Sequence, residues 1–150
     1  VAPVHLKLAQ IYSKLGDYKQ SETNADKVLA SEGGETAIPE KVLAAAMTVK
    51  GDALLGQKKS LAAVETYQKL LDRFEAKMPL GQVRYKVGQI LFERGDMKGA
   101  GEVWKRLEGT PGDLLWKLGK EKLDNSKWQD EYTKYTNRIP AMAKTGKEKP

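Results

Sequence analysis

A few side chains in this 150-residue sequence are of the types that carry catalysis, and their spacing decides what they do. The only histidine is His5, so a base-activated nucleophile would have to lie beside it. Two carboxylate pairs, Glu93 with Asp96 and Asp124 with Asp130, suit acid–base work or a hard cation. Both pairs lie among lysines at predicted turns, where helix capping and solvation explain carboxylates. We therefore predict no catalytic residue, no metal site and a solvated His5.

Two Gly-Asp turns invite comparison with phosphate-binding loops. They occur at Gly16-Asp17 and Gly95-Asp96. Neither has the further glycines and the Lys-Ser/Thr ending that surround a phosphate, so each is interpreted as one helix end followed by the next helix cap. The sequence also lacks cysteine, which removes thiol nucleophiles, disulfides and thiolate metal ligands. No cofactor is expected.

The charge balance is basic, with 26 Lys and Arg against 20 Asp and Glu and a net charge of +6. Because the charges are intermixed and no Arg-rich stripe or RNA-binding signature accompanies them, no nucleic-acid partner is expected. No apolar run approaches the roughly 20 residues that span a bilayer, so direct membrane insertion is not expected either.

Helical periodicity extends almost from end to end, with breaks at Gly, Pro and polar clusters. Ser60 and Asp96 are expected to cap helices. Pro140 is expected to end the pattern, leaving a flexible basic tail at 141–150. The predicted helices cover 3–15, 17–30, 39–56, 60–76, 79–95, 96–108 and 113–123, with an eighth beginning at 125 or 126.

A pattern of small and large residues occurs three times in these helices, with small residues at Ala9, Gly51 and Gly88. Tyr67 and Trp104 are large residues at matched places in the following helices. Small residues let paired helices approach closely, while large ones fill the seam between successive pairs. Irregular intervals between the copies predict local irregularity in the stack.

These residues resemble the tetratricopeptide repeat family, whose unit is an antiparallel helix pair of about 34 residues. The resemblance implies an all-α, right-handed α-solenoid of about four antiparallel helix pairs across residues 1–140. Its last pair would start at Leu118-Gly119 and be degenerate, since Glu131 occupies a small-residue position. Such a terminal pair would cap the stack.

The resemblance also implies a protein or peptide partner, bound on the inner surface formed by the first helix of each pair. Tyr85, Gln89 and Phe92 share one helical face, and aromatic residues supply most anchoring energy at such interfaces. Alternatively, Phe92 and Trp116 seal neighbouring pairs. The predicted partner-binding residues are Gln10, Ser13, Lys14, Thr48, Asp52, Leu55, Gln82, Tyr85, Gln89, Phe92, Trp116 and Lys120.

The sequence therefore favours a noncatalytic interaction module that acts as a scaffold or assembly factor. Family members that grip a terminal carboxylate use basic and asparagine side chains where this chain has Asp52 and Gln89, which argues against that mode. The alternative is a structural or oligomerising segment of a larger protein, with homo-oligomers possible, that uses the convex face and the last helices. Trp104 is expected in the core, whereas Trp128, Tyr132 and Tyr135 either cap the stack, as we favour, or dock to another subunit.

Neither the cellular compartment nor whether the chain is a piece of a longer protein follows from these residues. Irregular repeats with many lysines and no cysteine resemble bacterial envelope-associated members of the family. That analogy favours the bacterial cell envelope or periplasm over the cytoplasm.

Overall fold

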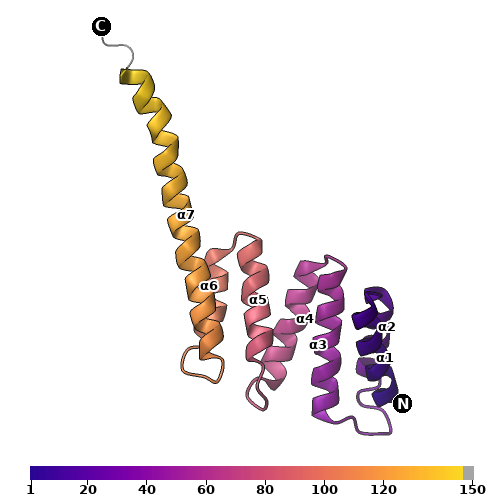
Figure 1. Cartoon of the computed structure of the whole chain (residues 1–150). Coiled ribbons are helices and arrows are strands. Elements are labelled where there is room, and N and C mark those ends of the chain that lie inside the picture. The colour runs from indigo at the N-terminus through magenta and orange to yellow at the C-terminus, as the bar shows by residue number, and fades with distance from the viewer. Residues whose placement is uncertain (147–150) are drawn as a thin grey trace.

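The computed structural model describes the backbone of residues 1–146 and the side-chain surroundings of residues 1–138. Within these limits the chain is all-α, as predicted, and forms seven helices and no strand (Figure 1). Their bounds are α1 Ala2–Leu15, α2 Tyr18–Ala30, α3 Glu40–Gly56, α4 Ser60–Phe74, α5 Gly81–Glu93, α6 Met97–Lys105 and α7 Asp113–Gly146.

Two of the three turns inside helix pairs use the predicted Gly-Asp chemistry. Gly16 ends α1, and Gly95 lies in the turn after α5. Both adopt left-handed backbone angles, with φ of 79° and 88°. Asp17 accepts a hydrogen bond from the Gln20 amide at 3.1 Å, and Asp96 accepts one from the Gly99 amide at 2.8 Å. These carboxylates satisfy amides that the first helical turn leaves unpaired.

The middle turn differs from the prediction. Ser60 is the first residue of α4, and Lys59 holds the cap position without a side-chain hydrogen bond. Lys58 takes the left-handed conformation, with φ of 62°, that glycine provides in the other two turns. The predicted Ser60 cap is therefore wrong, because the cap position of α4 lies one residue earlier, at Lys59.

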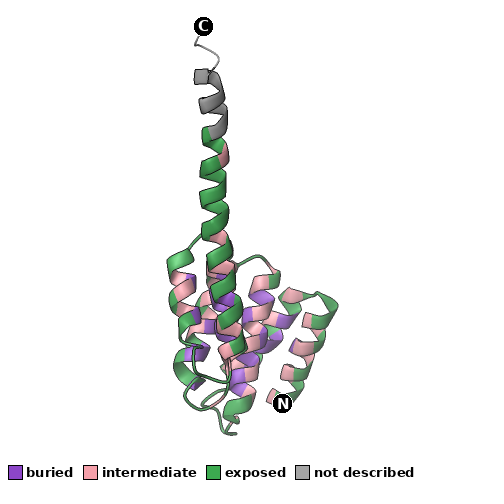
Figure 2. Cartoon of the chain, turned by 60° about the vertical axis from the view of Figure 1, so that its left-hand side comes forward, coloured by how far each residue is buried: buried purple, intermediate pink, exposed green. Residues whose placement is uncertain are grey.

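The helices form three antiparallel pairs, α1/α2, α3/α4 and α5/α6, that stand side by side in a row (Figure 1). Buried residues lie inside the row, and α7 packs against α5 and α6 at one end (Figure 2). The central cluster is large and includes Tyr67, Leu70 and Phe74 of α4. The cluster under the first pair is small and consists of Ala9, Ala25 and Val49.

Within the second and third pairs, a glycine on the first helix accommodates a ring from the second helix. A Cβ added at Gly51 would overlap the ring of Tyr67, and one at Gly88 would overlap the indole of Trp104. Trp104 is fully buried, as predicted, and donates its indole N–H to the Tyr85 carbonyl at 3.0 Å. Gly119 of α7 lies against the same indole, which a Cβ added at Gly119 would also overlap. The glycines thus set how closely neighbouring helices approach.

The predicted fourth helix pair is wrong, since residues 113–146 form one helix rather than two. The polar run at 124–126 contains no glycine or proline, so nothing in it forces the chain out of the helix. Pro140 does not end the helix either. Residues 147–150 of the predicted tail lie outside the described residues, and its flexibility stays a prediction.

The second half of α7 leaves the body and projects from the end of the row (Figure 2). Trp128, Tyr132 and Tyr135 are more than half exposed there, so the expectation that they cap the stack is wrong. The first half of α7 takes that role, with Leu115, Trp116 and Leu123 packing against a buried cluster of Ala100, Trp104 and Leu107, hereafter the Trp104 cluster. No described helix has the length and apolar character needed to cross a membrane.

Candidate functional site

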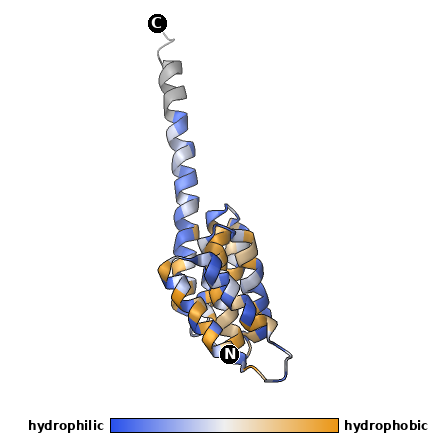
Figure 3. Cartoon of the chain, turned by 90° about the vertical axis from the view of Figure 1, so that its right-hand side faces the viewer, coloured by the Kyte–Doolittle hydropathy of each residue, from blue (hydrophilic) through white to orange (hydrophobic). Residues whose placement is uncertain are grey.

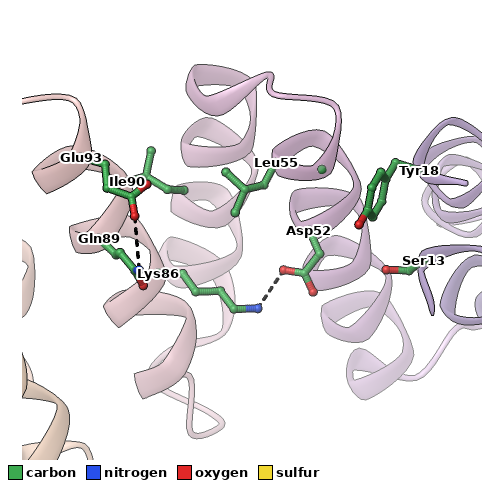
Figure 4. A pocket seen from close by; sticks show the side chains of 9 residues that line it. Ser13, Tyr18, Asp52, Leu55, Lys86, Gln89, Ile90 and Glu93 are labelled. Carbon is green, nitrogen blue, oxygen red and sulfur yellow. Dashed lines mark hydrogen bonds and ion pairs between the residues drawn. The ribbon is translucent and has the colours of Figure 1, made fainter. Parts of the chain in front are cut away.

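A groove of about 470 Å³ lies over the first helices of the three pairs, α1, α3 and α5 (Figure 4). Each of these helices contributes side chains, and Tyr18 joins them from the start of α2. The groove is thus formed by the stacking of the pairs rather than by any single pair. Its lining residues are Ser13, Tyr18, Asp52, Leu55, Gly56, Lys86, Gln89, Ile90 and Glu93.

Asp52 is the polar centre of the groove. Its carboxylate accepts hydrogen bonds from the Tyr67 hydroxyl and from the Lys86 ammonium, whose Nζ lies 2.8 Å from Oδ1. Burial, together with the hydrogen bond to Asp52, raises the pKa of Tyr67 well above its ordinary value, so the phenol remains a donor. The Lys86 ammonium also lies 5.9 Å from the centre of the Tyr67 ring. Lys86 is therefore oriented by both an opposite charge and an aromatic face.

The rest of the groove mixes amide, carboxylate and apolar surface. The Gln89 side-chain amide donates to the Glu93 carboxylate at 3.4 Å, one helical turn away (Figure 4). The Tyr18 ring lies against Gly56, where an added Cβ would come within 2.6 Å of the ring. Leu55 supplies apolar surface between these polar groups. Such a lining can contact both the main chain and the side chains of a bound segment.

The structure brings four of the predicted partner-binding residues together in this groove, namely Ser13, Asp52, Leu55 and Gln89. Gln10 and Thr48 are half-buried, and Lys14, Gln82 and Lys120 are exposed, but none of these five lines the groove. Their role in binding stays a prediction.

The predicted aromatic residues lie elsewhere. Tyr85 stacks on Trp104 with ring centres 5.6 Å apart, and the Phe92 ring centre lies 5.9 Å from that of Trp104. Trp116 packs against the same cluster from α7. These three half-buried side chains join the third pair to α7, which supports the alternative that Phe92 and Trp116 seal neighbouring elements.

Sequence reasoning missed five lining residues: Tyr18, Gly56, Lys86, Ile90 and Glu93. Lys86 and Glu93 lie three residues before and four after the predicted Gln89, so helical spacing alone was a usable signal for them. Tyr18 had no such signal, because it belongs to a second helix and reaches the groove only across Gly56.

His5 and Asp96, two of the residues considered for chemistry, have structural partners. His5 is half-buried rather than fully solvated, and its Nδ1 lies 3.2 Å from the Asn24 side-chain oxygen. Asp96 is occupied as a helix cap. Within the described residues, no group of three or more histidine or acidic side chains is arranged to hold a metal ion.

Successive antiparallel helix pairs with matched small and large residues define a helical-repeat protein of the stacked-hairpin class. The tetratricopeptide repeat family model matches residues 6–74 and again residues 48–113. The chain therefore belongs to the tetratricopeptide repeat family. Repeats of this family commonly mediate protein–protein interactions and are typically noncatalytic. No curated relative matches the sequence.

Proposed function

We propose that this chain is a noncatalytic binding module that holds a peptide or a segment of a partner protein in the groove over α1, α3 and α5. The observation that carries the proposal is that three helix pairs jointly line one groove with donors, acceptors and apolar surface. A segment bound there would contact all three pairs at once. The module would then act as a scaffold or assembly factor.

The ion pair of Lys86 bears on which part of a partner the proposed groove would take. Its ammonium is already paired with Asp52 at 2.8 Å, so it is not a free cation for a terminal carboxylate. Ser13 and Gln89 instead offer neutral groups that can hydrogen-bond peptide main chain. We therefore propose that the groove takes an internal segment of a partner rather than its carboxyl terminus.

The test uses a phage-displayed library of random linear peptides selected on the immobilised protein. Selected peptides are then measured by isothermal titration against the wild type, Lys86→Glu and Gln89→Ala. We expect each groove variant to weaken binding by about tenfold, because a hydrogen-bonding residue at the centre of a small site contributes about 1–2 kcal/mol.

Lys69→Glu is the matched control for Lys86→Glu. Lys69 lies on α4, and its side chain is 69% exposed beside Glu65. The Lys69→Glu substitution changes the net charge by the same amount as Lys86→Glu but leaves the groove untouched, so peptide binding should persist. Peptides that bind Lys86→Glu and Gln89→Ala as tightly as the wild type, while both variants keep the wild-type helical spectrum, would reject the groove as the binding site.

A further inference from the structure

The outer side of α1 presents an apolar stripe to solvent. Val4, Ile11 and Leu15 are 59%, 50% and 74% exposed, and the half-buried Leu8 lies between them on the same face. Their spacing of four, three and four residues is that of one helical stripe. Figure 3, which views the molecule from the N-terminal side, shows hydrophobic residues on this end of the row.

The later pairs show what kind of element covers this face. When the repeats are superposed on their small residues, Val4 and Ile11 match Val83 and Ile90 of α5. Val83 and Ile90 are only 5% and 4% exposed, because they pack in the central cluster with residues of α4. The stripe on α1 is therefore the face that in other pairs meets an antiparallel second helix of the preceding pair.

A suitable helix exists at the opposite end of the molecule. The projecting part of α7, residues 124–138, is hereafter called the arm. Trp128, Tyr132 and Tyr135 are 62%, 51% and 64% exposed on it, again with spacings of four and three residues, and the rings of Trp128 and Tyr132 stack 5.3 Å apart. The arm and α1 lie at opposite ends of the row (Figure 1), so the arm of one copy can meet only the α1 of another.

We propose that the arm of one copy packs antiparallel along α1 of a second copy, on the face that in the later pairs packs against a second helix. Two helices with stripes of this spacing interlock like the seam of a coiled coil. In one antiparallel register, Trp128 lies opposite Leu8 and Tyr132 lies opposite Val4. In this register Asn125 lies opposite Ile11, so the arm covers Val4, Leu8 and Ile11 over about two turns of helix, while Leu15 lies beyond residue 124, where the arm begins.

Charges beside the stripes fix the same register. Lys7 and Lys14 lie seven residues apart on one side of the α1 stripe, and α1 contains no acidic residue. Asp124 and Glu131 lie seven residues apart on the corresponding side of the arm stripe. In the antiparallel register that pairs the apolar residues, Lys7 lies opposite Glu131 and Lys14 lies opposite Asp124. All four side chains are exposed in the single chain.

This contact joins two different surfaces, so each copy both donates an arm and accepts one. Contacts of this kind close into a reciprocal pair or a ring, or continue as an open chain. The assembly leaves the groove over α1, α3 and α5 free, and it does not depend on what that groove binds.

The test measures self-association by sedimentation velocity over a wide range of protein concentrations. Lys7→Glu/Lys14→Glu makes the α1 flank acidic, and Asp124→Lys/Glu131→Lys makes the arm flank basic. Each double variant alone should associate at least about tenfold more weakly, since two attractive contacts become repulsive. An equimolar mixture of the two should associate again, because opposite charges then meet in both directions.

Lys41→Glu/Lys69→Glu is the control for the α1 variant, since it makes the net charge more negative by the same amount at two exposed lysines on α3 and α4. It should associate as the wild type does. A wild type that remains monomeric at every concentration would overturn the proposal. If only the arm variant weakened association, arms would pair with arms, which would also overturn the proposal. A mixture of the two variants that fails to associate would overturn it too.

Discussion

Gly88 is the position where the helix-pair packing can be tested most directly. Replacing it with alanine adds one methyl group to the middle of α5, directly over the indole of Trp104. Trp104 is fully buried and also lies against Gly119 of α7, where an added Cβ would overlap the indole, so the ring has little free space into which it can move. The methyl group must therefore force α5 and α6 apart or tilt the indole.

Three contributions set the size of the effect. Overpacking of a filled core costs about 1–3 kcal/mol. Tilting the indole also weakens its hydrogen bond to the Tyr85 carbonyl, worth about 1 kcal/mol. Alanine is favoured over glycine in a helix by about 1 kcal/mol, which offsets part of the loss. We expect Gly88→Ala to lower the free energy of unfolding by about 2 kcal/mol, or the melting temperature by about 4–8 °C for a chain of this size.

Urea denaturation followed by circular dichroism and tryptophan fluorescence measures this change. Gly101→Ala in the neighbouring helix α6 is the matched control, because a Cβ there would meet only a Leu123 methyl group at 3.4 Å. This control should be unchanged or more stable by up to about 1 kcal/mol, from helix propensity alone. A Gly88→Ala protein as stable as Gly101→Ala would refute the close approach of α5 and α6.

Two further predictions concern single polar contacts. Asp96→Ala removes the carboxylate that accepts from the Gly99 amide at 2.8 Å, and it should lower the free energy of unfolding by about 1 kcal/mol in urea titrations. The hydrogen bond from Arg73 lowers the pKa of Glu32 below its ordinary 4.5, so this contact stabilises the fold fully above that value and is lost as pH falls through the lower folded pKa. Because both groups are exposed, Glu32→Gln should cause a small shift in the acid unfolding curve that disappears in high salt; a shift independent of salt would contradict an exposed ion pair.

Local turn chemistry made much of the fold predictable. Gly16-Asp17 and Gly95-Asp96 end one helix and cap the next as expected, because glycine permits the left-handed conformation and aspartate accepts amide hydrogen bonds. The break predicted near Asn125 was wrong. Asp, Asn and Ser stabilise the first turn of a helix, but they do not by themselves end a helix that precedes them.

The candidate site was predictable only in part. Ser13, Asp52 and Gln89 followed from the face that first helices share, and the structure places all three in the groove. Tyr85 and Phe92 lie on the same helix as Gln89, yet they turn toward Trp104. A single sequence cannot tell which side chains of this face line the groove and which pack against the next element. The stacking angle of the pairs decides that, and local sequence patterns do not contain it.

The alanine cluster beneath the first pair has a consequence for local stability. Ala9 and Ala25 remove far less apolar area from water than Tyr67, Leu70 and Phe74 do in the central cluster. Amide protons of α1 and α2 should therefore exchange with solvent through a lower-energy opening than those of α4 and α5. A helix bound along α1 would raise that opening free energy in proportion to the logarithm of its concentration. The protection of the α1 and α2 amides would therefore increase with the concentration of the protein itself.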